Sequence, residues 1–450
     1  MIRHAFAAAM LLATVPLAAQ STTQDELDAR HDRALAAGYK ALFLCSAIAN
    51  AERNGATRTP ESVEAWELTG IQAPLDDLVG DMPYQISRDR EGELASVTVE
   101  WADDMRPRMA VHDSRMGCSQ LPIDGVPVPI ATKRPAETID RAPLVAPPSE
   151  LAEISSRALD GGYGDGTRTT AVLAMRDGEL LGEAYADDFG PAIPQRTWSV
   201  AKSIAATLVG AAVERGEADV SKRAGLGLYF NDRRKLITID NLLRMASGRY
   251  SDTAGNRTDP LYFGGATVTE SALHWPLLHQ PGTVYRYANN DTLAAVKAVE
   301  ASFADHPPAQ LLAMLGMEDT VAETDWRGDY ILSSQVWSTA RDLARLGQLY
   351  LDDGILPSGD RVLPEGWVDY VSAPSGPQPD GPFGYGAGFW LFNKSDGVPG
   401  DTFAAMGNRG QYVVIVPSLN VVIVRRGEDP SGSRFDIAAF TRDVLETLAE

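Results

Sequence analysis

Prolines divide this chain more sharply than any other feature of its sequence. Seven of the 29 residues from Pro122 to Glu150 are prolines. Because proline has no backbone N–H and a fixed φ, a segment this rich in it can form neither a helix nor a central strand. We therefore expect a linker over residues 126–149. It would separate a small N-terminal α+β domain, 21–125, from a larger folded unit, 150–450.

Charge limits the classes of partner. The 450 residues include 40 basic and 61 acidic side chains, which give a formal net charge of −21. Nucleic-acid binding needs Lys and Arg facing phosphates, so we expect no nucleic-acid partner and no attraction to an anionic membrane. The six His show no metal-ligand spacing, and we predict neither a metal nor a cofactor. Nothing in the sequence indicates the oligomeric state.

The N-terminus is typical of an exported protein. Arg3 precedes an apolar run from Ala5 to Ala19, and polar residues begin at Gln20. This order predicts a signal peptide over residues 1–20, so the protein would be periplasmic or secreted. The apolar run is too short and too rich in alanine to span a bilayer stably, and no later stretch looks suited to that role. We expect no membrane anchor.

Cys45 and Cys118 are the only cysteines, and both fall in the predicted N-terminal domain. In an oxidising compartment an even pair of cysteines is typical of a disulfide, which we predict here. Two buried free thiols are the alternative. The same domain should contain a helix over 25–51, from its spaced apolar residues, and a strand over 93–101, from its alternating pattern.

Hydrophobic periodicity in the larger unit predicts strands at both ends and helices between them. A hairpin is expected around the Asp177-Gly178 turn, with a helix before it at 149–159. Further helices are predicted over 199–215, 239–246, 292–303, 338–351 and 434–448, and strands over 388–392, 412–416 and 420–425. This order implies one sheet made from both ends of the unit, with a helical subdomain inserted.

Ser199 and Lys202 form the first candidate catalytic pair. They lie three residues apart at the start of a predicted helix, so the lysine amine can reach the serine hydroxyl. The helix that follows is apolar, and burial favours an uncharged lysine, which can act as the base for a serine nucleophile. A Ser-x-x-Lys match is weak evidence by itself, and a purely structural pair is the alternative.

Tyr287 and Asn289 form a second candidate motif, Tyr-x-Asn. The Pro281-Gly282 turn precedes it and a predicted helix follows it. Tyr229-Phe-Asn231 matches the same short pattern, but it lies in a charged loop. We therefore favour Tyr287 as the functional tyrosine.

Three motifs together resemble those of the serine β-lactamases and penicillin-recognising enzymes. Ser199-Val-Ala-Lys202, Tyr287-Ala-Asn289 and Gly407-Asn-Arg-Gly-Gln411 occur in that family's order. The likeness covers about residues 150 to 445 and is similar to the class C-like branch, which includes esterases and 6-aminohexanoate-dimer hydrolases. It implies an α+β fold, β-lactamase-like, in which helices from both chain ends flank an antiparallel sheet.

The resemblance also implies roles for individual residues. Ser199 would be the nucleophile, Lys202 its base and Tyr287 the proton relay to the leaving group. The backbone amides of Ser199 and Gln411 would bind the oxyanion. The predicted substrate-binding residues are Asn289, Asn408, Arg409 and Gly410.

The third motif departs from the β-lactamase pattern. Asn408-Arg409-Gly410 stands where that family has Lys-Thr-Gly or Lys-Ser-Gly. The lysine that contacts the carboxylate of a β-lactam is therefore missing, and Arg409 is the candidate replacement. We expect a serine hydrolase of small amides or esters, resembling 6-aminohexanoate-oligomer hydrolases or carboxylesterases. A β-lactamase or D-specific peptidase is the first alternative, and a penicillin-binding sensor without turnover is the second.

Overall fold

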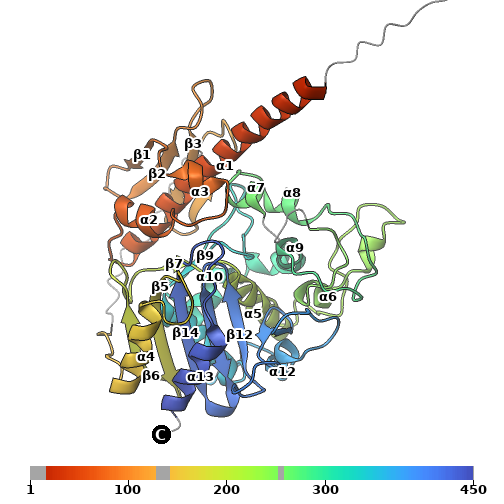
Figure 1. The fold of residues 1–450 in the computed structure, drawn as a ribbon. Coiled ribbons are helices and arrows are strands. Elements are labelled where there is room, and N and C mark those ends of the chain that lie inside the picture. The colour runs from red at the N-terminus through yellow and green to blue at the C-terminus, as the bar shows by residue number, and fades with distance from the viewer. Residues whose placement is uncertain (1–16, 128–141, 252–257, 449–450) are drawn as a thin grey trace, which may run out of the picture.

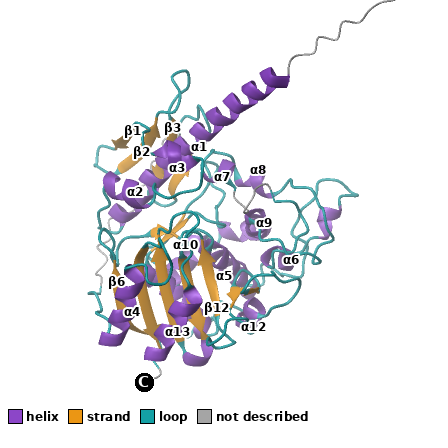
Figure 2. Cartoon of the chain, viewed as in Figure 1, coloured by secondary structure: helices purple, strands orange, loops and turns teal. Residues whose placement is uncertain are grey.

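Two β-sheets, one from each side of the proline-rich segment, organise the computed structural model, which describes residues 17–127, 142–251 and 258–448. The first sheet has four strands and packs on the long helix α1 (Leu17–Arg53), drawn in red and orange in Figure 1. The second has seven strands and lies between helices, as Figure 2 shows. Most of the predicted linker, 128–141, and the predicted signal peptide up to residue 16 lie outside the described residues.

Apolar residues on every side of the second half of α1 determine its place in the fold. Every residue from Ala34 to Ala51 is buried. A helix that is apolar all round is stable inside a core, and short elements surround this one. They are α2 (Pro60–Trp66), α3 (Leu75–Val79) and the antiparallel strands β1 (Tyr84–Arg88), β2 (Leu94–Val99), β3 (Arg108–Asp113) and β4 (Gly117–Gln120).

The predicted disulfide between Cys45 and Cys118 is confirmed. It joins α1 to β4, and both residues are completely buried. The bond closes a loop across a sequence separation of 73 residues. On the chain-entropy account, a loop of this size stabilises the folded state by about 4 kcal/mol.

From the sequence we expected no membrane-spanning helix, but one part of α1 has the length and composition of such a helix. The stretch Thr23–Arg53 is long and apolar enough, by length and composition, to cross a membrane. Its apolar window is entirely buried by the rest of the protein, which is how the core helix of a folded domain behaves.

The seven-stranded sheet brings together strands from both ends of the larger unit, as predicted. Its order is β10-β11-β12-β13-β14-β5-β6, and every neighbouring pair is antiparallel. The strands are β5 (Thr169–Arg176), β6 (Glu179–Tyr185), β10 (Gly384–Tyr385), β11 (Trp390–Leu391), β12 (Phe403–Gly407), β13 (Gln411–Val416) and β14 (Val421–Gly427). Because β14 pairs with β5, the first and last strands of the unit meet near the middle of the sheet.

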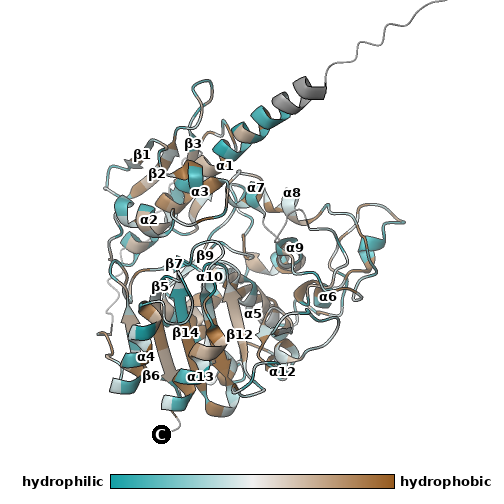
Figure 3. Cartoon of the chain, viewed as in Figure 1, coloured by the Kyte–Doolittle hydropathy of each residue, from teal (hydrophilic) through white to brown (hydrophobic). Residues whose placement is uncertain are grey.

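Alternating side chains of the central strands build a core on each face of this sheet. Leu173 and Val424 are opposite each other and pack with the helices α5 and α11, whereas Ala174 and Ile423 pack with α4 and α13. The central strands are accordingly brown, or hydrophobic, in Figure 3. The four helices are α4 (Ser149–Leu159), α5 (Val200–Glu214), α11 (Ala340–Leu351) and α13 (Ile437–Thr447).

The segment between β6 and β10 contains the inserted helical subdomain. Its remaining helices are α6 (Ile239–Leu243), α7 (Asp259–Tyr262), α8 (Val268–Ala272), α9 (Asn289–Val299), α10 (Pro308–Met314) and α12 (Trp367–Ser372). A small third sheet, β7-β9-β8, connects it to the start of α5; its strands are β7 (Gln195–Arg196), β8 (Val321–Ala322) and β9 (Val336–Ser338). The α+β fold class predicted from the sequence is confirmed.

The core around α1 continues into the larger unit. Phe43 on α1 lies 6.0 Å from the ring of Trp198 and 5.9 Å from that of Trp337. Tyr39, one turn earlier, lies 4.5 Å from Phe263. The sequence indicated a separate domain and a linker, so it did not suggest this shared apolar cluster. The N-terminal region therefore packs directly on the segment that leads into α5.

Candidate active site

Ser199 lies at the N-cap of α5, where the chain turns from β7 into the helix. Its side chain makes no capping hydrogen bond to the helix, and the residue is partly exposed. A helix N-terminus presents unpaired N–H groups and the positive end of the helix dipole. Negative charge that develops on or next to Ser199 is therefore stabilised by its position.

Three acceptor-type atoms surround the Lys202 amine. Its Nζ lies 2.8 Å from Ser199 Oγ, 2.7 Å from Asn289 Oδ1 and 2.9 Å from the backbone oxygen of Ser333. A neutral amine has two N–H donors and one lone pair. If the donors go to Asn289 and Ser333, which cannot donate at those atoms, the lone pair faces the Ser199 hydroxyl. The serine can then donate its proton to the lysine.

Burial lowers the pKa of Lys202 well below its ordinary value. The residue is 1% exposed. Among the described residues, its hydrogen-bond partners are neutral oxygens, and none is a carboxylate. An ammonium group without a counter-charge is unfavourable in such a place, so the uncharged amine is favoured.

Asn289 and Ser333 fix the position of the lysine amine. Asn289 is the first residue of α9, and its Nδ2 donates to Thr258 Oγ1 at 3.3 Å, which leaves Oδ1 facing Lys202. The Ser333 hydroxyl is 2.7 Å from the hydroxyl of Tyr262. Asn289 was predicted as a substrate-binding residue, and the structure brings it to the lysine instead. Ser333 contributes a backbone oxygen, for which no side-chain signal exists in the sequence.

Tyr287 lies beside the pair, as the sequence predicted. Lys202 Nζ is 5.0 Å from the centre of its ring. Burial raises the pKa of Tyr287 above its ordinary value, against a hydrogen bond with Ser199 that lowers it. The rings of Trp390 and Tyr385, at 5.3 and 5.9 Å, enclose it. The phenol therefore keeps its proton at neutral pH and can donate it.

Trp198, immediately before Ser199, has a left-handed backbone with φ of 48°. Bulky residues rarely adopt this conformation, and surrounding packing must hold it. The Arg196 guanidinium lies 4.1 Å from the Trp198 ring centre and donates to Ser334 Oγ at 2.8 Å. One arginine thus stabilises the residue before the serine and the turn that bonds the lysine. No pattern in the sequence indicates this strain.

The third predicted motif is the hairpin turn between β12 and β13. β12 ends at Gly407 and β13 begins at Gln411, so residues 408–410 form the turn. A Cβ on Gly407 would lie 2.4 Å from the Thr197 oxygen and 3.1 Å from the backbone nitrogen of Ser199. A side chain at Gly407 would therefore separate the turn from Ser199. The turn begins next to the serine N–H.

Gly410 and Gln411 face the interior of the hairpin. A Cβ on Gly410, whose φ is 78°, would lie 1.7 Å from Nη1 of Arg425. The close approach that requires a glycine here is that of Arg425, not of a substrate, which corrects the role expected for Gly410. The buried Gln411 side chain accepts a hydrogen bond from Arg426 Nε at 2.5 Å.

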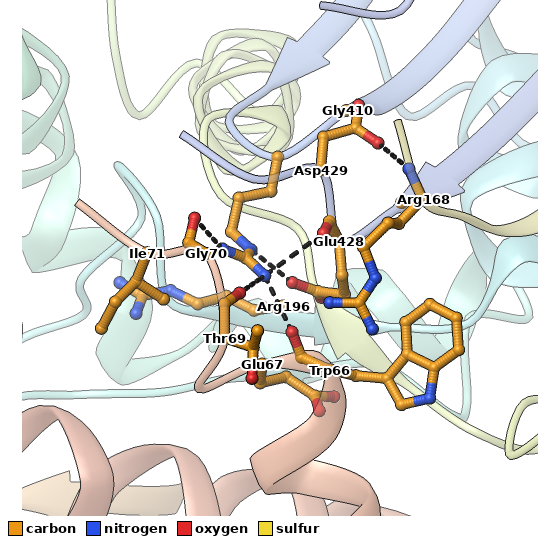
Figure 4. A network of polar contacts seen from close by, with 12 residues as sticks. Trp66, Glu67, Thr69, Gly70, Ile71, Arg168, Arg196, Gly410, Glu428 and Asp429 are labelled. Carbon is orange, nitrogen blue, oxygen red and sulfur yellow. Dashed lines mark hydrogen bonds and ion pairs between the residues drawn. The ribbon is translucent and has the colours of Figure 1, made fainter. Parts of the chain in front are cut away.

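Arg409 directs its side chain toward the N-terminal region. Its Nε donates to Glu428 Oε2 at 2.6 Å, and its Nη2 donates to the backbone oxygens of Trp66 and Thr69 at 2.8 and 2.9 Å. Figure 4 shows Trp66 and Thr69 facing Glu428 across this network. Because its guanidinium is already neutralised and saturated, Arg409 does not replace the missing motif lysine. This corrects its predicted role in substrate binding.

Asn408 and Tyr229, the two remaining residues that the sequence brought into consideration, are both exposed. Asn408 is exposed within the turn that begins beside Ser199, so its side chain is accessible to a ligand. Tyr229, in the competing Tyr-x-Asn match, is 70% exposed on a loop. Of the two tyrosines, Tyr287 is the one that adjoins Lys202.

The groups assembled here are a hydroxyl, an uncharged amine, a phenol and backbone amides. Over residues 17–127, 142–251 and 258–448, no group of three or more His, Cys, Asp or Glu is placed to hold a metal ion. The assembled set supports attack by a serine with proton transfer through lysine and tyrosine.

Comparison with known proteins identifies the family to which this chain belongs. The sequence profile of the Beta-lactamase family matches residues 156–443, which is more than half of the chain. The matched stretch contains Ser199, Lys202, Tyr287 and the β12–β13 turn. It leaves out α1 and the four-stranded sheet.

Individual relatives are distant and cover the same part of the chain. A 6-aminohexanoate-dimer hydrolase from Paenarthrobacter ureafaciens is 26% identical over 325 residues, which are 66% of this chain and 80% of the relative. A structure described as a 6-aminohexanoate-dimer hydrolase from Bacillus anthracis has a TM-score of 0.54 at 19% identity, covering 65% of this chain and 80% of that one. A structure described as a β-lactamase from Bacteroides dorei has a TM-score of 0.53 at 20% identity, covering 67% and 99%. At these identities the two structures show a shared fold.

Proposed function

Because this chain belongs to the Beta-lactamase family and is a serine hydrolase, we propose that it cleaves small amides or esters through an acyl-enzyme, as 6-aminohexanoate-oligomer hydrolases and carboxylesterases do. The relative named for hydrolysis of the 6-aminohexanoate dimer supports an amide-type substrate. The conclusion depends mainly on one observation, the buried Lys202 amine 2.8 Å from the Ser199 hydroxyl and without a carboxylate partner among the described residues.

In the proposed acylation, Ser199 Oγ attacks the substrate carbonyl and gives its proton to the neutral Lys202. Tyr287, which is protonated at neutral pH, donates a proton to the departing oxygen or nitrogen. Water then attacks the acyl-enzyme with the same groups in reverse roles, and this step regenerates the serine. Asn289 keeps the lysine amine directed at the hydroxyl throughout.

The developing oxyanion needs two N–H donors, and the backbone N–H of Ser199 is the first. We propose the N–H at Asn408, the first residue of the turn after Gly407, as the second. The 3.1 Å approach of a Gly407 Cβ to the Ser199 nitrogen supports this position. It replaces the Gln411 amide expected from the sequence, because Gln411 already belongs to the buried side of the hairpin.

A β-lactamase or D-specific peptidase remains the second candidate, favoured by the family and by the Ser-Lys-Tyr set. The engagement of Arg409 with Glu428 counts against it, because no lysine stands at the motif position that contacts a substrate carboxylate. Penicillin-binding sensors retain the serine and lysine without turnover. Release of the acyl group distinguishes an enzyme from such a sensor.

The same proposal includes the chain's organisation and location. The apolar N-terminal run and the disulfide support a signal peptide over 1–20 and a periplasmic or secreted protein. The proposed units are 21–125, the linker 126–149 and the hydrolase 150–450. Edman sequencing of the mature protein tests the cleavage site.

A substrate panel tests the activity. We expect p-nitrophenyl esters of short acids to be hydrolysed fastest and some linear amides more slowly. Ser199→Ala should reduce every rate by about 10⁴-fold or more while leaving the fold intact, since the serine side chain makes no capping bond that alanine would remove. A fluorophosphonate should label Ser199 in the wild type. Wild-type activity in Ser199→Ala on every substrate would place the nucleophile elsewhere.

A further inference from the structure

Every nitrogen of the Arg409 side chain is hydrogen-bonded, and Nη1 and Nη2 connect the β12–β13 turn to the N-terminal region. Nε bonds to the Glu428 carboxylate, and Nη1 donates to the backbone oxygen of Gly70 at 3.0 Å. Nη2 donates to the oxygens of Trp66 and Thr69 and, at 3.3 Å, to that of Glu428. The residue is 6% exposed. An exposed surface arginine would not need so complete a set of acceptors.

The N-terminal region supplies these acceptors because a helix ends there. Trp66 is the last residue of α2, and the carbonyls at the end of a helix have no partner within it. The chain then turns at Gly70, whose φ is 68°, and passes so close to Pro430 that a Cβ would lie 2.8 Å from its Cβ. Ser431 donates its N–H to the Gly70 oxygen at 2.7 Å. The loop and the C-terminal segment are thus held together around the guanidinium.

The backbone of the turn is held from the same side. The Asp429 N–H donates to the Arg409 oxygen at 3.2 Å, and Arg425 Nη1 donates to the Gly410 oxygen at 2.9 Å. Two of the three turn residues are therefore anchored by side chain or backbone. The third, Asn408, follows Gly407 directly and lies on the Ser199 side of the turn.

We propose that Arg409 is a positioning residue through which the N-terminal region holds the Asn408–Gly410 turn in register with Ser199. The inference rests on the proposed hydrolase function. It assigns a task to the part of the chain that lies outside the Beta-lactamase match. The N-terminal region is then a structural part of the active site, although it contributes no catalytic group.

The physical basis is the precision that an oxyanion site needs. Backbone donors stabilise the transition state only when they are about 3 Å from the developing charge, and an error of about 1 Å can cost about 100-fold in rate. A hairpin turn with φ of 55° at Arg409 and 78° at Gly410 has no regular ladder to hold its tip. The anchored guanidinium adds to the restraint that Asp429 and Arg425 place on the turn backbone.

Arg409→Lys tests the proposal because it keeps the charge but reduces five N–H donors to three. We expect kcat on p-nitrophenyl acetate to fall about 10- to 100-fold with KM little changed. Affinity for a boronic acid, which forms a tetrahedral adduct with the serine, should fall by a similar factor. The acid limb of the pH profile should not move, since Lys202 is untouched.

Arg341→Lys is the matched control. Arg341 also pairs with a buried glutamate, Glu183, and donates to the backbone oxygens of Ala142 and Pro143 at 2.7 and 2.8 Å. That contact involves β6, the edge strand at the other end of the sheet from β10, with β13, β14 and β5 between it and β12. Its loss should lower stability and leave kcat and boronate affinity unchanged.

Rates are expressed per active site. Active sites are counted by complete labelling with a fluorophosphonate, so that unfolded protein does not lower the measured rate. Glu428→Gln, which keeps the shape and removes the pairing charge, should change kcat in the same direction as Arg409→Lys. If Arg409→Lys has the kcat and boronate affinity of the wild type, or loses no more than Arg341→Lys, the proposal is wrong. A wild type that neither turns over nor takes the label would instead contradict the proposed function.

Discussion

Two buried basic side chains, Lys202 beside Ser199 and Arg409 in the β12–β13 turn, are accommodated in opposite ways. Lys202 has neutral oxygens as hydrogen-bond partners, and burial lowers its pKa. Arg409 has a buried carboxylate, Glu428, which contributes to raising its pKa against the effect of burial. Lys202 is therefore favoured as an uncharged amine, whereas Arg409 remains charged and is compensated in place.

This difference is what we expect if Lys202 takes part in the reaction and Arg409 holds chain segments in place. Burial without a counter-charge destabilises the protonated form of an amine. The uncharged form is therefore favoured, and in that form the amine can act as a base. A buried ion pair with all donors used holds two chain segments in one arrangement, whatever its net effect on stability. We expect substitutions of Lys202 to remove activity, and substitutions of Arg409 and its partners to lower activity only in part.

Of the two side chains compared, Lys202 should give the larger effect when it is replaced, in Lys202→Arg. Arginine suits a helix and is also basic, but it does not lose its proton near neutral pH, so we expect kcat/KM to fall by about 10³-fold or more. In the wild type, kcat/KM should rise with pH as Lys202 deprotonates, and the rise should end well below the ordinary lysine value of 10.5. Stopped-flow or steady-state pH profiles measure both.

A Lys202→Arg enzyme with substantial activity would break the comparison, because both cations would then be structural. Tyr287 would become the better candidate for the base. Thermal unfolding of the variant provides the control that its fold is retained.

Tyr287→Phe should have the next largest effect and should depend on the leaving group. Burial raises the pKa of the phenol, so it stays protonated near neutral pH and has a proton to donate, which an amine leaving group needs more than a nitrophenolate does. We expect about a 100-fold loss on amides and a much smaller one on p-nitrophenyl esters. Equal losses on both substrate types would mean that Tyr287 orients the lysine rather than protonating the leaving group.

Poor turnover of β-lactams should follow from the engagement of Arg409. A charge-assisted hydrogen bond contributes about 1.5–3 kcal/mol, so its absence lowers transition-state stabilisation by about 10- to 150-fold. A chromogenic cephalosporin should therefore be hydrolysed far more slowly than a short-acyl ester. If it is the better substrate, and Arg409→Ala abolishes that preference, Arg409 leaves Glu428 to bind substrate, and the contrast between the two cations fails.

The smallest effect on turnover is expected from removal of the disulfide. Cys45→Ser with Cys118→Ser should reduce the free energy of unfolding by about 4 kcal/mol, because α1 and β4 are no longer joined. At temperatures where the protein remains folded, the ester rate per labelled active site should be unchanged. A lower rate in fully folded protein would show that the disulfide contributes to the position of the active-site groups as well as to stability.

The sequence by itself determined the elements whose signals are local. The Ser199–Lys202 pair follows from helical spacing, and the apolar run after it predicts burial of the amine, which the structure has. The hairpin at Asp177-Gly178 and the closing strands follow from alternation and turn chemistry. The pairing of the two cysteines needed only their number and an oxidising compartment.

Only the tertiary structure decided which distant parts of the chain these residues contact. The Ser333 oxygen beside Lys202, Gly407 against Ser199 and the direction of the Arg409 side chain all depend on contacts between segments far apart in the chain. Arg409 and its acceptor Trp66 are 343 residues apart. A motif specifies a residue type at a position, but a long, charged side chain has several partners of similar energy within its reach. Burial of the whole interface selects one of them, and no local pattern records that choice.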